Sequence, residues 1–369
     1  MLKHKDHFHG SDLEKIEEIY GIKKEDITSF SANVNPLGLS PLLKEELSSH
    51  LDVISSYPDR EYKKLRSTIA DYCSASPENV LVGNGSTELI SLFIKFINPK
   101  KALILGPTYS EYEREIALGG GNSMYFPLEE EDNFTLNIDK FIATLDDNID
   151  LIVMCNPNNP TSSAISRSDM RRILDTCLKF HIFVLVDETY IEFTEEYDKL
   201  NCIKLTQSYN NIVILRGISK FFAAPGLRLG YAVCGNIPLL SKINSVKDPW
   251  TINSLAEIAG QLMFSDSDYI NASRELISSE RKRVTKELSE IDGIKVYPPC
   301  ANFVLCRIEK ENVDADILFD MAIRQNLMIR NCSSFPFLDN TYFRLCFMNP
   351  SDNDKLIEVI RKCLSQTKP

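Results

Sequence analysis

An amine and a carboxylate stand at the ends of two apolar runs in this sequence. Lys220 follows the run Ile212–Leu215, and Asp187 follows the run Phe183–Val186. A lysine at the carboxyl end of a buried strand lies where ligands bind in open α/β sheets, and partial desolvation lowers its pKa and makes it a Schiff-base amine. A carboxylate at a neighbouring strand end could pair with a protonated ring nitrogen. Each residue alone is more often a surface lysine or a helix cap, so the prediction depends on the residues around them.

Two further groups could reach the same crevice. Asn159 lies in the loop NPNNPT, which follows the run Leu151–Cys155 and by itself indicates only a tight turn. Tyr190 lies three residues after Asp187 and can direct its hydroxyl back towards the site. Three strand ends would thus supply an amide, a carboxylate and an amine to one place.

An anion-binding loop is the fourth feature. Gly85, Ser86 and Thr87 lie in the stretch GNGSTE, between the run Val80–Val82 and an amphipathic stretch. Gly85 permits a close backbone approach, and the free N–H groups of a helix start together with two hydroxyls form a cradle for an anion. Arg228 could hold a phosphate in the same pocket by a charge-assisted pair. The G-x-G-x-x-G fingerprint of dinucleotide binding is absent from this stretch.

The apolar runs alternate with amphipathic stretches of helical spacing. We expect strands at the runs and helices between several of them, which predicts an α/β fold with a largely parallel sheet. Runs that are apolar throughout are typical of strands covered on both faces. The expected strands are 80–82, 102–105, 151–155, 183–186, 212–215 and 231–233, and expected helices include 87–97 and 168–180.

The sequence changes character after about residue 255. A long charged helix is expected at 271–291, followed by short strands and two more helices. This pattern predicts a smaller α+β domain. We therefore predict an N-terminal arm at 1–35, a large domain at 36–255 and a small domain at 256–369, to which the arm contributes.

Composition narrows the functional class. The chain has 369 residues, with 41 Lys and Arg against 52 Asp and Glu, and this net charge of −11 argues against nucleic-acid binding. No apolar run approaches the roughly 20 residues that span a bilayer, and the charged N-terminus lacks the apolar core of a secretory signal. Ten scattered cysteines without a Cys-x-x-Cys pair favour reduced thiols. We therefore expect a cytoplasmic enzyme with a small-molecule substrate and no nucleic-acid or membrane partner.

The motifs GNGSTE, PTYSEY, NPNNPT, DETY and SK…GLRLG together resemble the fold-type I pyridoxal-phosphate enzymes of the aminotransferase class I/II group. The resemblance covers nearly the whole chain and implies an aspartate aminotransferase-like fold with pyridoxal 5′-phosphate as cofactor. It implies a catalytic set in which Lys220 binds the cofactor covalently and Asp187 pairs with its ring nitrogen. Asn159 and Tyr190 would bind the ring 3′-oxygen. The remaining implied cofactor contacts are Tyr109, stacked on the ring, and a phosphate cup of Gly85, Ser86, Thr87, Ser219 and Arg228.

Two positions depart from the family pattern, and a third implies a partner. Gly217, three residues before the lysine, stands where the family carries Ser or Thr, so one hydroxyl for the phosphate is missing. Ser162 stands where a glycine would follow NPNNPT. Tyr57, in the stretch SYPD, resembles the tyrosine that reaches the cofactor phosphate of the neighbouring subunit, which implies a homodimer.

Several stretches are more similar to the L-threonine-O-3-phosphate decarboxylases of cobalamin synthesis than to the rest of the family. They include FSANVNPLG, YPDREY and IRNCSSFPFLDNTYFR, whereas Ser11 and Asp12 replace the Gly and Asn that this subgroup carries after an N-terminal histidine. By this resemblance one arginine binds the substrate α-carboxylate and an N-terminal segment covers the substrate. The implied substrate-binding residues are Arg344 for the carboxylate, Asn35 in the covering segment, and His9, Asn33 and Arg330 for a phosphate.

Three functions remain open at this point. The first is a lyase that releases CO2 from an O-phospho-L-amino acid, and the second is an aminotransferase similar to histidinol-phosphate aminotransferase, with the same residues. The third is a non-catalytic cofactor-binding regulator, for which the chain has neither a basic patch nor spare length. No metal is expected, although His4, His7 and His9 lie close together in the sequence, and the acidic run Glu129–Asp132 is predicted to be a solvated loop.

Overall fold

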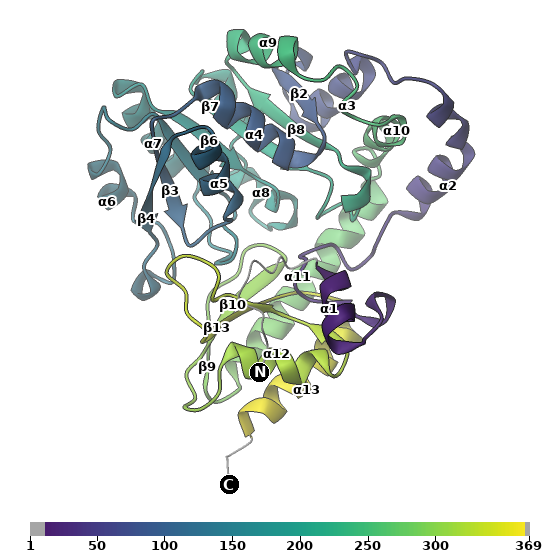
Figure 1. Cartoon of the computed structure of the whole chain (residues 1–369), viewed down its shortest axis with the longest axis vertical. Coiled ribbons are helices and arrows are strands. Elements are labelled where there is room, and N and C mark those ends of the chain that lie inside the picture. The colour runs from purple at the N-terminus through teal and green to yellow at the C-terminus, as the bar shows by residue number, and fades with distance from the viewer. Residues whose placement is uncertain (1–11, 366–369) are drawn as a thin grey trace.

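A seven-stranded sheet forms the centre of the larger of two domains in the computed structural model, which describes residues 12–365 (Figure 1). Six of the strands run parallel, and β8 runs antiparallel to both of its neighbours. The strand order is β2-β8-β7-β6-β5-β3-β4. The strands are β2 (Val80–Gly83), β3 (Lys101–Gly106), β4 (Asn122–Pro127), β5 (Leu151–Cys155), β6 (Phe183–Asp187), β7 (Ile212–Gly217) and β8 (Gly230–Cys234).

The six strands predicted from apolar runs are all confirmed, and β4 is the strand that the sequence did not predict. It lies at one edge of the sheet, and its residues are exposed or half-buried. Edge strands need no continuous apolar run, so the signal was weak. By contrast, every residue of β5 is buried.

Helices cover the sheet as its apolar faces require. Helix α7 shows why they form, since the Ser166 hydroxyl accepts a hydrogen bond from the Asp169 N–H at 3.1 Å and caps the helix start. The residues of α7 that are buried recur at helical spacing. The helices of this domain are α2 (Pro41–Ser49), α3 (Lys63–Cys73), α4 (Gly85–Ile97), α5 (Glu111–Leu118), α6 (Ile138–Ala143), α7 (Arg167–Lys179), α8 (Tyr197–Leu200), α9 (Ile237–Val246) and α10 (Ser254–Met263).

The smaller domain is built on an antiparallel sheet of order β12-β13-β10-β9 within the described residues. Helix α11 (Ser267–Ser289) runs from the large domain into it (Figure 1). The strands are β9 (Ile294–Val296), β10 (Phe303–Ile308), β12 (Arg330–Asn331) and β13 (Tyr342–Cys346), and the other helices are α12 (Ala315–Ile323) and α13 (Pro350–Ser365). The predicted fold class, a mostly parallel α/β domain with a smaller α+β domain, is confirmed.

The N-terminal segment packs beside the small domain. Strand β1 (Thr28–Ser29) pairs in parallel with β11 (Leu327–Met328), and α1 (Leu13–Tyr20) lies next to α12 (Figure 1). The domain boundary predicted at residue 255 falls inside α10, which packs against α3 of the large domain.

The acidic run around Glu130 was predicted to be a solvated loop, and for Glu130 that prediction is wrong. One oxygen of its carboxylate accepts hydrogen bonds from Lys295 Nζ at 2.8 Å and the Tyr297 hydroxyl at 2.6 Å. The other accepts from Arg307 Nη1 and the Tyr342 hydroxyl, both at 2.9 Å. Partial burial raises the pKa of the Glu130 carboxyl, but these donors outweigh it and lower the pKa to about 2. Glu130 therefore joins the large domain to the small-domain sheet.

Three general properties concern residues 12–365. All ten cysteines lie in this range and carry free thiols; nine are buried and Cys300 is half-buried. Within the same range no cluster of His, Cys, Asp and Glu side chains could hold a metal ion, and no helix is long and apolar enough to cross a membrane. The histidines considered as metal ligands, His4, His7 and His9, lie outside the described residues.

Candidate active site

The predicted site residues gather along one edge of the large sheet. Strands β2, β3, β5, β6 and β7 all end at this edge, and the antiparallel strand β8 begins there. Consecutive parallel strands therefore bring loops from distant parts of the chain together. The Asp187 that ends β6 pairs in register with Cys155 of β5 and Leu215 of β7.

Lys220 lies just beyond β7 and is half-buried. Its Nζ donates a hydrogen bond to the Ala32 carbonyl at 2.6 Å. Burial lowers the pKa of the Lys220 amine to about 8, and the positive charge of Arg344 acts in the same direction. Roughly a fifth of an amine with this pKa is neutral at about pH 7.4, far more than for an ordinary lysine, and the neutral form is the one that a nucleophile requires.

Asp187 is buried, and three donors surround its carboxylate. The Tyr112 hydroxyl donates to Oδ2 at 2.8 Å, the Thr189 N–H donates to Oδ1 at 3.0 Å, and the Thr189 hydroxyl also donates to Oδ1. Burial raises the pKa of Asp187, while the hydrogen bonds from Thr189 and Tyr112 oppose that rise. The site therefore holds a carboxylate that a cationic partner would stabilise.

Tyr112 and Thr189 were missed by the sequence analysis. Tyr112 follows the predicted ring-stacking residue Tyr109 by three residues, and the two rings meet edge to face with centroids 5.6 Å apart. Both residues lie in motifs that had been recognised, Tyr112 in PTYSEY and Thr189 in DETY. Tyr112 is three residues after Tyr109 and Thr189 is two residues after Asp187, and this proximity in sequence could have indicated that they belong to the site. Burial raises the pKa of the Tyr109 hydroxyl to about 12.

The predicted anion cradle lies at the start of α4. Gly85 has a φ of +78°, and a Cβ at this position would lie 2.3 Å from Nη2 of Arg228. The backbone conformation favours glycine, and a Cβ here would displace the Arg228 guanidinium. Arg228 donates to the carbonyls of Pro225 at 3.2 Å and Asn84 at 3.5 Å. Ser86, Thr87 and Ser219, the other predicted members of the phosphate cup, are half-buried.

Packing does not require a glycine at position 217, where the family carries Ser or Thr. A Cβ on Gly217 would have the Leu229 carbonyl at 3.5 Å and the Ser86 hydroxyl at 3.8 Å as its nearest atoms, which are ordinary contacts. A Cβ would therefore fit at this position, and nothing in the structure explains the glycine.

A strap of five residues, Ser31–Asn35, crosses the site. The Ser31 carbonyl accepts a hydrogen bond from Arg344 Nη2, and the Ala32 carbonyl accepts one from Lys220 Nζ. Asn33 Nδ2 donates to the Tyr190 hydroxyl at 3.5 Å. The Asn35 amide, predicted to belong to the substrate cover, is occupied by the protein itself, because it donates to the Phe221 carbonyl at 2.8 Å and the Ser273 hydroxyl at 2.7 Å. Asn35 therefore anchors the strap.

The two predicted substrate arginines stand side by side. Arg344 of β13 and Arg330 of β12 are directly opposite in the antiparallel pair, so both project from the same face. Arg344 is buried and donates to Asn159 Oδ1, while its Nε has no partner within residues 12–365. Burial lowers the pKa of Arg330 to about 10, and the charge of Arg344 adds to the effect. Arg330 donates to the Ser334 hydroxyl at 2.9 Å.

One predicted residue, Tyr57, does not join this cluster. The Tyr57 side chain is 81% exposed, and its ring packs on Trp250 with centroids 4.8 Å apart. His9 lies outside the described residues.

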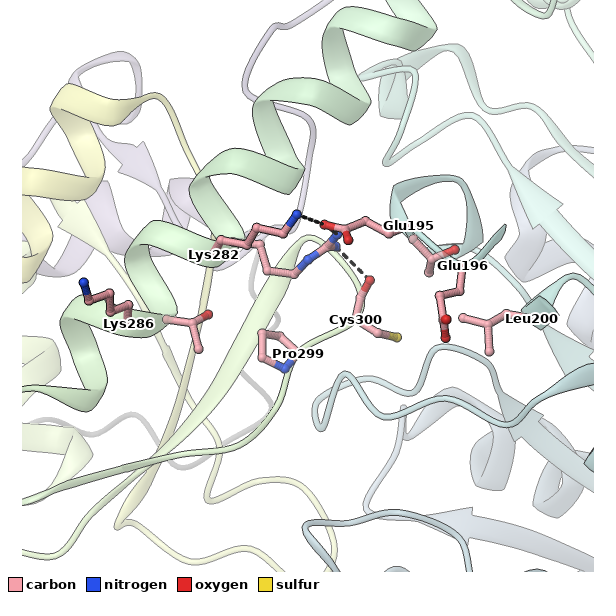
Figure 2. Close-up of a pocket in the computed structure, with 10 residues that line it drawn as sticks. Glu195, Glu196, Leu200, Lys282, Lys286, Pro299 and Cys300 are labelled. Atoms are coloured by element: carbon pink, nitrogen blue, oxygen red, sulfur yellow. Dashed lines mark hydrogen bonds and ion pairs between the residues drawn. The ribbon is translucent and has the colours of Figure 1, made fainter. Parts of the chain in front are cut away.

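A cavity of about 520 Å³ lies elsewhere, at the boundary of the two domains. Lys282 and Lys286 on α11 line one wall, Glu195 and Glu196 line another, and Cys300 lies between them (Figure 2). None of the predicted site residues lines this cavity, so it is separate from the candidate active site.

Comparison with known proteins identifies the group. Residues 25–360 match the aminotransferase class I and II family. The chain belongs to this family. It is 32% identical to the threonine-phosphate decarboxylase of Salmonella typhimurium over 98% of each chain, and 34% identical to the histidinol-phosphate aminotransferase of Caldanaerobacter subterraneus subsp. tengcongensis over 95% of this chain and 98% of that protein. The crystal structure of the histidinol-phosphate aminotransferase from Clostridium acetobutylicum superposes with a TM-score of 0.84 at 31% identity, covering 90% of this chain and 98% of that one.

Members of the aminotransferase class I and II family use pyridoxal phosphate, which is the cofactor of this enzyme. The residues present fit it. Asp187 is a buried carboxylate with neutral donors only and a raised pKa, so a protonated pyridine nitrogen would supply the missing charge. Lys220 is an amine with a lowered pKa, and the Gly85–Arg228 cradle is narrow and cationic, as a phosphate requires.

We expect the rate at which the apoenzyme captures pyridoxal phosphate to rise with pH. Only a neutral amine attacks an aldehyde, and with a Lys220 pKa of about 8 the neutral fraction grows about tenfold per pH unit below that value and levels off above it. Stopped-flow absorbance of the cofactor over about pH 6 to 9.5 measures this rate. A capture rate that stayed flat over this range would show that another group limits the reaction.

Proposed function

We propose that this chain is a pyridoxal-phosphate-dependent lyase that removes CO2 from a small O-phosphorylated amino acid, with L-threonine O-3-phosphate as the first candidate substrate. The observation that carries the proposal is the pair Arg330 and Arg344. Like charges directly opposite on paired strands repel each other, so the pair is best stabilised by a ligand with two anionic groups. An O-phospho-amino acid has a carboxylate and a phosphate of this kind. The 32% identity to the Salmonella typhimurium threonine-phosphate decarboxylase supports the same choice.

The two arginines would bind the two anionic groups of the substrate. Arg344, held by Asn159 and the Ser31 carbonyl, would bind the α-carboxylate, and its unpartnered Nε within the described residues offers one more donor. Arg330 would bind the phosphate and so help to fix the orientation of the bonds at Cα. Pyridoxal phosphate, when bound, supplies an electron-withdrawing ring.

Lys220 has the proton-transfer role. When the bond from Cα to the carboxylate breaks, CO2 leaves and the electron pair stays with the Cα side of the substrate. The Lys220 ammonium would then deliver a proton to Cα, and its pKa of about 8 places it between the charged and neutral forms near neutral pH. Asp187 would keep positive charge stable at the ring nitrogen throughout.

The proposal is tested by incubating the holoenzyme with L-threonine O-3-phosphate. Mass spectrometry should detect 1-aminopropan-2-yl phosphate together with one CO2 per turnover. L-threonine without the phosphate is the matched control, and it should turn over much more slowly because it has no phosphate for Arg330 to bind. If no amine phosphate forms, the lyase proposal is wrong.

An aminotransferase is the second candidate, and the 34% identity to a histidinol-phosphate aminotransferase favours it. In that reaction the Cα–H bond breaks instead, and Lys220 would move this proton from Cα to the cofactor carbon. The outcome that identifies it is conversion of the enzyme-bound cofactor to the pyridoxamine form by L-glutamate or histidinol phosphate, without release of CO2.

Asp12 offers a test of the phosphate subsite. Its negative charge acts on Arg330 and raises the pKa of that guanidinium, against the larger effect of burial. A carboxylate here would also repel a substrate phosphate. We expect Asp12→Asn to lower the KM for L-threonine O-3-phosphate about two- to fivefold, the range of one half-exposed charge interaction. Steady-state kinetics with the phosphorylated substrate measures the change. An increase in KM would show that Asp12 helps rather than hinders binding.

We also propose that the enzyme is a cytoplasmic homodimer. Tyr57 and Trp250 form an exposed aromatic pair, and Leu51 and Ile54 nearby in the sequence are also more than half exposed. An exposed apolar patch of this kind is typical of a protein–protein interface. The ten free thiols support a reducing compartment. A mass of one chain by light scattering would contradict the dimer.

A further inference from the structure

Ser162 occupies an unusual position in the cofactor loop. It is fully buried and has a φ of +60°, a conformation that favours glycine. Its N–H donates to the Asn158 carbonyl at 2.7 Å, which continues the loop that carries Asn159. A serine in this conformation costs free energy relative to glycine. We therefore expect the interactions of its hydroxyl to compensate for that cost.

The Ser162 hydroxyl reaches across to the small domain. Its Oγ accepts hydrogen bonds from the Ala301 N–H at 2.9 Å and the Cys300 N–H at 3.2 Å. The Cys300 N–H also has the Ser162 carbonyl at 3.1 Å, but the Ala301 N–H has only the hydroxyl among the described residues. Ala301 is fully buried, so loss of the hydroxyl would leave a buried donor without an acceptor.

The same two residues are held from the opposite side by Arg281 of α11. Its Nη1 donates to the carbonyls of Cys300 at 2.8 Å and Ala301 at 2.9 Å, and also to the Phe193 carbonyl at 3.1 Å. Arg281 Nη2 pairs with Glu195 at 3.0 Å, and Glu195 and Cys300 both line the cavity drawn in Figure 2. The peptide of Cys300–Ala301 is thus clamped between the cofactor loop and the interdomain helix.

The clamped peptide leads directly into the substrate-binding face. Asn302 donates to the Asn33 carbonyl of the strap at 3.0 Å. Phe303 packs edge to face on Tyr190 with centroids 4.9 Å apart, and its ring lies 5.4 Å below the guanidinium of Arg344. A shift of Cys300–Ala301 would therefore move the platform under the carboxylate-binding arginine.

We propose that Ser162 is a positioning residue: its hydroxyl fixes Cys300–Ala301, and through Phe303 and Asn302 it sets the position of Arg344 and the strap relative to the cofactor loop. It rests on the proposed function only in requiring an amino-acid substrate with an α-carboxylate. Asn159, which accepts a hydrogen bond from Arg344, lies in the same loop as Ser162. The Ser162 hydroxyl therefore connects this loop to Ala301, on the small-domain side of the carboxylate site.

The test compares Ser162→Gly and Ser162→Ala in the holoenzyme. Both remove the hydroxyl; glycine also relieves the backbone conformation, whereas alanine keeps it. We expect the KM for L-threonine O-3-phosphate to rise about five- to tenfold in both variants, with kcat changed less than about threefold. Affinity for pyridoxal phosphate and the absorbance of the bound cofactor should stay as in the wild type. Ser74→Gly, at an exposed serine with a φ of +53°, is the matched backbone control and should leave KM unchanged.

A second measurement does not depend on the substrate. Hydrogen exchange of the ligand-free holoenzyme should be faster at the amide of Ala301 in both Ser162 variants and unchanged in Ser74→Gly. If the wild type does not turn over L-threonine O-3-phosphate, the proposed function fails, and the concentration of L-glutamate that half-saturates the cofactor absorbance change replaces KM. An unchanged KM, a fall in kcat alone, or a parallel loss of cofactor affinity would each overturn the positioning role.

Discussion

Replacement of Lys220 by alanine is expected to reduce turnover by about 1,000-fold or more, because the residue serves both as the covalent anchor and as the proton donor to Cα. The structure gives the physical reason. Burial and the nearby charge of Arg344 lower the pKa of this amine to about 8, so it can be neutral for attack and charged for proton delivery near physiological pH. Borohydride reduction of the wild-type holoenzyme should fix the cofactor on the peptide that contains Lys220, and Lys220→Ala should carry no fixed cofactor.

Lys247 provides the matched control. It is also a half-buried lysine of the large domain, and burial lowers its pKa as well, but its amine stands over the ring of Tyr62 at 5.4 Å and takes no part in the site. Lys247→Ala should therefore keep both turnover and the reducible cofactor. Fixation of the cofactor on any other lysine, or substantial turnover in Lys220→Ala, would contradict the assigned role.

The sequence was sufficient to place the site because strand ends are set by local patterns. An apolar run of five residues predicts a buried strand, and parallel strands end at the same edge, so Lys220 and Asp187 had to lie close together. The position of Gly85 at the start of a helix, directly after a strand, could be predicted for the same local reason.

Contacts between distant segments could not be predicted in this way. Asn35 bonds to Ser273, which is 238 residues away in the sequence, and Glu130 bonds to Tyr342, which is 212 residues away. No local pattern encodes such a pair, because it depends on how the small domain and the strap pack against the large sheet. Ser162 was recognised only as a departure from a motif, and its partners became visible only with the fold.

The loss expected for Asp187→Asn is about 100- to 1,000-fold in kcat, comparable to removal of one preorganised electrostatic group from an active site. An amide cannot supply the negative charge that favours a protonated ring nitrogen. The hydrogen bonds from Tyr112 and Thr189 hold the carboxylate in place against the cost of burial. Steady-state kinetics and a titration of the apoenzyme with pyridoxal phosphate measure the effect, and the dissociation constant for the cofactor should also rise.

The stability of the apoenzyme separates this loss from simple unfolding. Because the pKa of Asp187 is raised in the folded chain, the folded state binds more protons than the unfolded state above the ordinary aspartate pKa, and the free energy of unfolding falls as pH rises through that window. Once the pH exceeds the raised pKa of Asp187 the penalty is complete, so above that pH Asp187→Asn should leave the Tm of the apoenzyme equal or higher while activity is lost. Glu192→Gln is the matched control, since burial raises the pKa of Glu192 to about 7 and the residue lies outside the site. That variant should keep its turnover, whereas its Tm also reports the loss of the 3.6 Å ion pair between Glu192 and Arg216. If Asp187→Asn instead lowered the Tm, or retained most of its kcat, the carboxylate would be a structural group, and the ring nitrogen would need no charged partner.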